Sequence, residues 1–182
     1  MKSFSAQSIF SSSMDENEST RIQFDLIRQI DTILCTAKIH YWLRGGWAID
    51  FILGRMTRFH SDIDLVAWKH DAIQIRYLLE DAGFLFERDT GVQIDLSKLG
   101  QEISIVFIVQ NGEKVGVANI PEWIWLPDAL TFPPQQIDEL VCPVISPRQL
   151  LEEKAGYQRG TGIPPRDKDL QSIKVLEHYL RN

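Results

Sequence analysis

The segment that most constrains the fold is residues 60–65, which read His-Ser-Asp-Ile-Asp-Leu. Asp62 and Asp64 alternate with apolar Ile63 and Leu65, the period of two that predicts a β-strand with one buried face. Successive strand side chains point to opposite faces, so the two aspartates share one face, with their Cα atoms roughly 7 Å apart. Two carboxylates this close repel each other unless a cation lies between them.

A hard divalent cation suits such a pair, because Mg²⁺ prefers oxygen ligands and keeps several waters. We therefore expect Mg²⁺ or Mn²⁺ here, bound jointly with the phosphates of a nucleotide. By itself the pattern is short, and an exposed strand edge that carries two aspartates satisfies it as well. The upstream residues favour the metal site: Gly45-Gly46 follows a short apolar strand and opens a helix. Backbone N–H groups at such a turn approach an anion closely.

The remaining chain mixes helical and strand patterns. Apolar periodicity, turn residues and caps predict helices at 19–37, 47–53, 71–82, 147–159 and 166–180, with Ser146 as the N-cap of the fourth. They predict strands at 41–43, 63–68, 84–88, 92–96, 102–109, 114–118 and 139–145, and irregular structure over 119–136. This order predicts an α+β (or α/β) fold: a mixed twisted sheet flanked by helices, with a small helical part at about 146–182.

Residues 1–18 are serine-rich and lack the apolar core of a signal peptide. We expect a flexible tail there, with Met14 as an alternative start. A single ordered domain over 19–182 is expected to follow, its first helix capped by Ser19 or Thr20.

Composition excludes several classes of protein. The formal net charge is −6, which argues against bulk nucleic-acid binding but leaves room for a local basic pocket. Cys35 and Cys142 are too few for a disulfide scaffold or a zinc finger, and two ordinary thiols indicate a reducing compartment. No apolar run reaches the roughly 18 residues that span a membrane. We therefore expect a cytoplasmic protein.

The segment from Gly45 to Asp64 resembles the nucleotidyltransferase superfamily. Its strings Gly-Gly-Trp-Ala-Ile-Asp, Leu-Gly-Arg and Thr-Arg-Phe-His-Ser-Asp-Ile-Asp are similar to those of the small antibiotic nucleotidyltransferases, namely the aminoglycoside 2''-adenylyltransferases and lincosamide nucleotidyltransferases. A weaker similarity extends from Ser19 onward and includes Ser146-Pro147, Leu150-Leu151, Lys154 and Arg166-Asp167-Lys168-Asp169.

The resemblance implies the nucleotidyltransferase fold and transfer of a nucleoside monophosphate from an NTP to a hydroxyl of a small molecule, with release of pyrophosphate. It implies that Asp62 and Asp64 hold the metal ions and that the triphosphate is bound by Gly45, Gly46, Arg58 and Lys154. Trp47 is expected to pack behind the glycine turn, and His60 to have a structural role. Lys168 and Asp169 are expected to form a solvated helix face or an ion pair that docks a helix.

One residue departs from the family pattern. Members usually carry a third carboxylate, in a pattern like Gly-x-x-apolar-Asp-apolar-His, as a metal ligand or as the base toward the acceptor hydroxyl. The matching stretch begins at Gly100 and has Ser104 in place of the aspartate and Val106 in place of the histidine. A serine hydroxyl is neutral and needs help to act as a base near neutral pH.

Two nearby carboxylates are candidates to replace the missing one. Glu102 lies two residues before Ser104, on the same strand face. Asp95 lies opposite Ser104 if 92–97 and 102–109 form a hairpin around Leu99-Gly100, and directly opposite side chains share a face. A slip of one residue would turn Asp95 away. A site with only two carboxylates is the remaining alternative.

Four readings of function follow. The first is metal-dependent nucleotidyl transfer to a small hydroxylated compound, such as an aminoglycoside or lincosamide. The second is a catalytically impaired nucleotide-binding or regulatory protein, favoured by Ser104. The third is a nucleotidyltransferase acting on a macromolecule such as a tRNA, which the acidic balance disfavours. The last is a domain without a ligand. Residues 121–130 either line the acceptor pocket or cover the sheet as a packed loop, and the sequence leaves the oligomeric state open.

Overall fold

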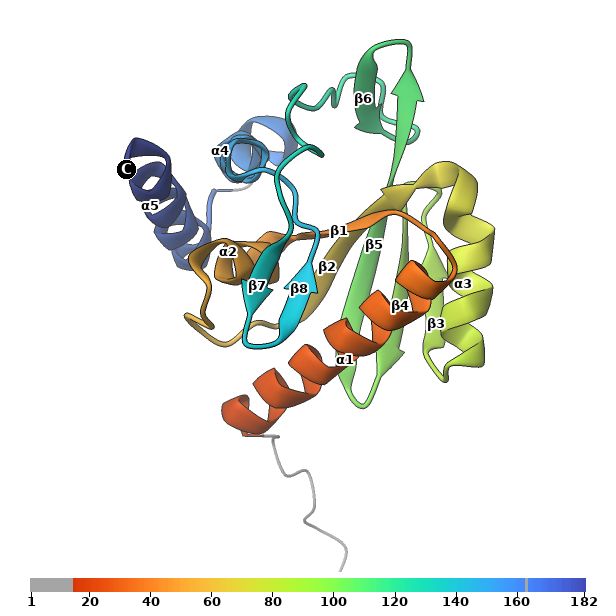
Figure 1. Cartoon of the computed structure of the whole chain (residues 1–182). Coiled ribbons are helices and arrows are strands. Elements are labelled where there is room, and N and C mark those ends of the chain that lie inside the picture. Colours follow the sequence, from red (N-terminus) through yellow and green to blue (C-terminus); the bar gives the residue numbers. More distant parts are fainter. Residues whose placement is uncertain (1–14, 163) are drawn as a thin grey trace, which may run out of the picture.

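The computed structural model describes residues 15–162 and 164–182, and a mixed six-stranded sheet forms its centre (Figure 1). Its strands are β1 (Tyr41–Arg44), β2 (Asp62–Trp68), β3 (Leu85–Asp89), β4 (Gln93–Lys98), β5 (Gln101–Asn111) and β6 (Lys114–Val117). They are ordered β1-β2-β5-β4-β3, and β6 pairs with β5. Only β2 and β5 are parallel among these neighbouring pairs. The predicted mixed sheet is confirmed.

Helices flank this sheet and share its core. They are α1 (Glu16–Thr36), α2 (Gly45–Leu53), α3 (Ala72–Asp81), α4 (Pro147–Thr161) and α5 (Asp167–Arg181), with a 3-10 turn over Lys69–Asp71. α1 contacts α3, β2 and β5, whereas α2 contacts β1 and β2 on one side and α4 and α5 on the other (Figure 1). Burying apolar side chains provides most of the stabilisation of such a core. A single hydrophobic cluster contains residues from α1 through α5.

The start of α1 differs from the prediction. The helix begins at Glu16, and Asp15 rather than Ser19 or Thr20 is the N-cap, because its carboxylate accepts a hydrogen bond from the Asn17 N–H. Ser19 is buried and instead donates to Gln101 on β5. The predicted tail boundary at residue 18 is therefore wrong for residues 15–18, and residues 1–14, including Met14, lie outside the described residues.

The C-terminal part largely follows the prediction. Ser146 Oγ accepts a hydrogen bond from the Gln149 N–H, which confirms the predicted cap of α4. The helix extends through Thr161, two residues beyond the predicted end. A second sheet pairs β7 (Gln135–Ile137) with β8 (Leu140–Cys142). This hairpin was missed in part, since 135–136 was predicted irregular and three-residue strands carry little periodic signal.

No helix within the described ranges is long and apolar enough to cross a membrane. Both cysteines are free thiols, with Cys35 exposed and Cys142 buried.

Candidate functional site

A row of polar side chains crosses one face of the sheet. Arg44 on β1 pairs with Asp64 on β2, and Asp64 pairs with Ser104 on β5. Ser104 pairs in turn with Asp95 on β4, and Asp95 with Arg88 on β3. Directly paired residues share a face, so the sheet gathers these side chains although they are far apart in the sequence. The predicted register of Asp95 opposite Ser104 is confirmed.

Asp62 and Asp64 lie half-buried on the same face of β2. Ile63 and Leu65, which alternate with them, are 0% and 1% exposed, as the strand period predicts. Asp62 on β2 lies directly opposite Glu102 on the neighbouring strand β5. The Glu102 side chain is exposed and has no hydrogen bond or ion pair within the described residues. Asp62 and Asp64 therefore form the predicted pair, and Glu102 is a free carboxylate beside it.

The surroundings of Asp64 favour a nearby cation. Burial raises the pKa of the Asp64 carboxyl, and the charges of Asp62 and Glu153 raise it too, while Arg44 and Lys154 lower it. A raised pKa means that the ionised carboxylate is under-compensated in the free protein. A bound divalent cation would supply the missing positive charge.

Arg44 and Glu153 form an ion pair beside Asp64 that the sequence did not predict. Arg44 Nε donates to Glu153 Oε2 at 2.7 Å, and both side chains are mostly buried. A signal for Arg44 existed, because a charged residue ends the otherwise apolar strand Tyr-Trp-Leu-Arg directly before the glycine pair. Glu153 had no such signal, since it lies 109 residues from Arg44 in the sequence.

Asp95 is tied to Ser104 by a hydrogen bond. Ser104 Oγ donates to Asp95 Oδ1 at 2.8 Å, Gln93 donates to the same oxygen at 2.7 Å, and Arg88 donates twice to Oδ2. Burial raises the pKa of Asp95, but the hydrogen bonds from Arg88, Ser104 and Gln93 outweigh it and hold the pKa below its usual range. Asp95 is thus ionised, and the hydroxyl of Ser104, the strand partner of Asp64, connects it to the site.

The glycine pair lies where side chains would not fit. Gly45 has φ +66°, and a Cβ there would be 2.1 Å from Asp64 Oδ2. A Cβ on Gly46 would be 2.2 Å from His60 Nδ1 and 3.0 Å from a guanidinium nitrogen of Arg58. The glycine pair opens α2, so its backbone lies between the carboxylates and Arg58, as expected of a phosphate-binding turn.

Buried Asp50 fixes the loop that carries Arg58. Its carboxylate accepts from the Thr57 N–H at 3.1 Å and from the Thr57 hydroxyl, and it is 2.7 Å from His60 Nε2. The His60 ring is 4.9 Å from that of Trp47, which is fully buried. The predicted structural positions of His60 and Trp47 behind the turn are confirmed, whereas the role of Asp50 was not predicted.

Lys154 and Asp169 join the last two helices. Lys154 Nζ donates to Asp169 Oδ1 at 2.9 Å, and Arg166 Nε donates to Oδ2 at 2.7 Å. Asp169 is therefore a helix-docking residue, one of the two predicted alternatives. Lys168 instead reaches Ser61 Oγ at 3.3 Å, next to the carboxylate pair. Two lysines, Lys154 and Lys168, thus border the site from α4 and α5.

Replacing Asp169 by asparagine is expected to destabilise the protein by about 2–3 kcal/mol at pH 7. Loss of one partner from a buried pair costs roughly 3–5 kcal/mol, reduced here because Lys154 and Arg166 are partly exposed. Burial alone would raise the pKa of Asp169, but Arg166 and Lys154 depress it. This stabilisation is therefore present above the unfolded pKa of about 3.9 and is lost as the pH falls below it.

Urea unfolding of Asp169→Asn and wild type from pH 7 down to pH 3 measures this difference. Asp167→Asn is the matched control, because Asp167 is exposed in the first turn of the same helix. A difference that does not shrink with falling pH would exclude the ion-pair explanation.

The segment 121–130 packs beside the site. Trp125 and Ala129 are buried, although Trp123 is 44% exposed. The Leu126 N–H donates to Gln149 Oε1 at 2.9 Å, and Gln149 in turn donates to Glu153, the partner of Arg44. The predicted loop packing is confirmed, and hydrogen bonds link this loop to the row of polar side chains.

The chemistry of the site fits a magnesium ion shared with phosphates. Within residues 15–162 and 164–182, no three His, Cys, Asp or Glu side chains come together to hold a metal. Asp62 and Asp64 would therefore supply only part of the coordination. Mg²⁺ commonly binds one or two carboxylates and completes its shell with water and substrate phosphates.

Comparisons with known proteins agree with this geometry. The family model described as aminoglycoside-2''-adenylyltransferase matches residues 26–176. A 2''-aminoglycoside nucleotidyltransferase of Klebsiella pneumoniae is 51% identical over 43 residues, which cover 24% of each chain. The matches to the curated relatives span less than half of those proteins' length.

Two solved structures share the fold over nearly the whole chain. The crystal structure of ANT(2'')-Ia with adenylyl-2''-tobramycin has a TM-score of 0.76 and 21% identity, covering 87% of this chain and 90% of that one. Lincomycin-bound LnuA, a lincosamide antibiotic adenylyltransferase, has a TM-score of 0.68 and 25% identity, covering 85% and 96%. Both relatives have nucleotidyltransferase folds, which confirms the predicted fold.

Proposed function

This chain belongs to the aminoglycoside-2''-adenylyltransferase family, and from that premise we propose that it transfers a nucleoside monophosphate from an NTP to a hydroxyl group of a small antibiotic. The observation that carries the proposal is the half-buried Asp62-Asp64 pair directly beside the Gly45-Gly46 turn. A carboxylate pair that needs a cation and a turn open to phosphates together suit a metal-bound nucleotide.

We assign the metal ion and the triphosphate to the following residues. Asp62 and Asp64 hold Mg²⁺ or Mn²⁺, which supplies charge neutralisation on the phosphate oxygens. The backbone of Gly45 and Gly46 faces the triphosphate, and Arg58 and Lys154 contact its outer phosphates. Lys154 is also paired with Asp169, so α5 docking and phosphate binding depend on the same side chain.

The reaction forms a bond between the acceptor oxygen and the α-phosphorus and breaks the bond from that phosphorus to the bridging oxygen. The electron pair of the broken bond leaves with pyrophosphate. We propose that the acceptor proton passes to Ser104 Oγ while the Ser104 proton passes to Asp95 Oδ1. Positioning and charge neutralisation provide most of the acceleration of phosphoryl-type transfer. The relay through Ser104 supplies the remaining proton transfer without a third carboxylate at residue 104.

The acceptor side of the site is acidic. Glu102 and Glu153 lie beside the carboxylate pair, and hydrogen bonds through Gln149 link the segment 121–130 to Glu153. Negative side chains attract a cationic compound such as an aminoglycoside. Two relatives named above were solved with an aminoglycoside product or with lincomycin, so both antibiotic classes are candidate acceptors. A cytoplasmic location follows from this proposed use of NTP.

The proposal is tested by incubating the protein with Mg²⁺ or Mn²⁺, each radiolabelled NTP and a panel of aminoglycosides and lincosamides. We expect label on at least one antibiotic, only when the metal is present. NTP binding without transfer to any compound would instead favour the impaired, regulatory alternative that Ser104 suggests. In a parallel reaction that contains tRNA, label on the tRNA but on no antibiotic would favour the macromolecular alternative.

The relay predicts that Asp95→Asn and Ser104→Ala each lower kcat by roughly 10²-fold, within the range for proton-transfer groups. The double variant is expected to lose no more than either single one, because both residues act as one unit. Asp25→Asn, at an exposed position on α1, is the control. Unchanged turnover in Asp95→Asn would remove Asp95 from the mechanism.

A further inference from the structure

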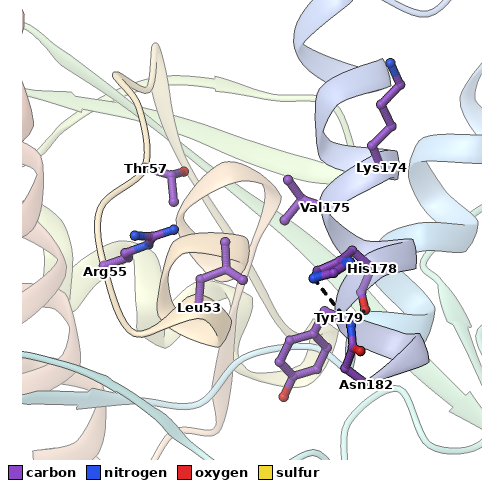
Figure 2. Close-up of a pocket in the computed structure, with 8 residues that line it drawn as sticks. All are labelled: Leu53, Arg55, Thr57, Lys174, Val175, His178, Tyr179 and Asn182. Carbon is purple, nitrogen blue, oxygen red and sulfur yellow. Dashed lines mark hydrogen bonds between the residues drawn. The ribbon is translucent and has the colours of Figure 1, made fainter.

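A groove runs from the glycine turn along α5. Its inner part is a cavity of about 390 Å³ that starts at Gly46 and Arg58. Its outer part, of about 1000 Å³, lies between the end of α2 and the last turns of α5. Both parts share Thr57, Lys174 and Val175 as lining residues, so they form one continuous groove. Figure 2 shows Leu53 and Arg55 facing α5 across the outer part.

The groove is basic in an acidic protein. Its ionisable side chains include Arg55, Arg58, Lys174 and His178, against a formal net charge of −6 for the chain. Among the described residues that line the two cavities, Asp50 is the one with a carboxylate side chain, and this buried carboxylate is hydrogen-bonded to Thr57 and His60. Apolar Leu53 and Val175 separate the cations from the core. The groove therefore has a positive potential that favours an anion.

Two of these cations have no partner of their own. The side chains of Arg55 and Lys174 make no hydrogen bond or ion pair within the part of the chain that the structure describes. They lie on opposite walls, Arg55 after α2 and Lys174 on α5 (Figure 2). Neither is needed for the ion pairs that dock α5, which are made by Asp169. Both are free to bind an anion that enters the groove.

The groove leads away from the carboxylate pair, starting on the Gly46 side of the glycine turn. Gly45 faces Asp64, whereas Gly46 faces Arg58 and His60, where the groove begins. The acceptor and the α-phosphate must meet at the metal-binding carboxylates, on the acidic side. The outer phosphates then extend past Gly46 toward Arg58, at the inner end of the groove. The product that leaves from this end is pyrophosphate, which carries a high negative charge.

We propose that the groove between α2 and α5 binds inorganic pyrophosphate and guides its release, through Arg58 at its inner end, Lys174 where the inner and outer parts meet, and Arg55 at its mouth. The inference rests on the proposed nucleotidyl transfer. Exposed cations that hold an anion loosely favour release over trapping, because salt and water compete for each contact. The outer part of the groove, with a volume of about 1000 Å³, leaves room for hydrated pyrophosphate.

The test measures pyrophosphate binding directly, by isothermal titration with Mg²⁺, in wild type, Arg55→Gln, Lys174→Gln and the double variant. Each single change is expected to weaken pyrophosphate binding about threefold to fivefold, and the double change about tenfold or more. NTP affinity is expected to fall less in Arg55→Gln, since the NTP phosphates reach only the inner end of the groove and Arg55 lines only its outer part. Lys114→Gln, an exposed lysine on β6, is the control.

Equal pyrophosphate affinity in the double variant and wild type would overturn the inference, and so would active transfer by a wild-type protein that binds no pyrophosphate. Neither result would affect the proposed function if transfer continues. Conversely, a protein that binds pyrophosphate through Arg55 and Lys174 but transfers no nucleotide would disprove the function while supporting the groove as the pyrophosphate site.

Discussion

Replacing Asp64 by asparagine is expected to slow metal-dependent nucleotide transfer by orders of magnitude while leaving the protein folded and no less stable. A metal ligand at the reacting phosphate is worth several kcal/mol, so kcat should fall by roughly 10²- to 10⁴-fold. Burial and the charge of Asp62 raise the pKa of Asp64, so its ionised form destabilises the free fold as the pH rises above about 4. A neutral side chain of the same shape removes that repulsion.

The measurement pairs turnover with thermal unfolding, with and without Mg²⁺ and NTP. Asp25→Asn serves as the control, because Asp25 is exposed on α1 and far from the carboxylate pair in the sequence. Retained turnover in Asp64→Asn would exclude Asp64 as a metal ligand. A large loss of stability would instead mean that Asp64 mainly holds the fold together, contrary to its raised pKa.

Replacing Gly45 by alanine is expected to remove nucleotide binding and to destabilise the protein by about 2–5 kcal/mol. A left-handed backbone costs an alanine roughly 1–2 kcal/mol, and overpacking adds about 1–3 kcal/mol. The new Cβ would lie 2.1 Å from Asp64 Oδ2. The carboxylate must therefore move, and the site loses the alignment that binds the metal and phosphates.

Gly112→Ala separates these two effects. Gly112 has φ +62°, close to that of Gly45, but nothing lies within 4 Å of its Cβ position. The Gly112→Ala variant is expected to lose only the stability that a left-handed backbone costs an alanine, and to bind NTP normally in a titration. Normal NTP binding by Gly45→Ala would contradict the close approach of Gly45 to Asp64 as a requirement of the site.

Features encoded over short distances in the sequence were predictable. Alternation placed Asp62 and Asp64 on one face, and the Leu99-Gly100 turn set the register that brings Asp95 to Ser104. Turn chemistry determines hairpin register, so this contact followed from local residues. The start of α1 was not predicted correctly, because Asp15, Ser19 and Thr20 are all residues that cap helices and only tertiary contacts decide among them.

Features that depend on distant contacts were not predictable. The ion pair between Arg44 and Glu153 joins β1 to α4, and no local pattern links them. Lys154 was assigned to phosphate from resemblance alone, and its bond to Asp169 became visible only once the two helices were docked. The two basic cavities along α5 could not be predicted for the same reason, since Arg55 and Lys174 lie 119 residues apart in the printed sequence.

The structure also changes the meaning of Ser104. From the sequence, a missing negative charge at this residue favoured an inactive protein. In the structure a carboxylate is present one strand away, hydrogen-bonded to the Ser104 hydroxyl at 2.8 Å and held ionised by Arg88. The negative charge lies on β4, at Asp95, instead of on β5 at residue 104. The proposed relay depends on the hydrogen bond between Ser104 and Asp95.

The most direct test of the account is the mass of an antibiotic after incubation with the purified protein, Mg²⁺ and NTP. We expect an aminoglycoside or lincosamide heavier by one nucleotidyl group, with one pyrophosphate released for each antibiotic modified, and both products formed roughly 10²- to 10⁴-fold more slowly by Asp64→Asn. An unmodified antibiotic in every reaction, from a protein that also binds no NTP in the presence of metal, would contradict it.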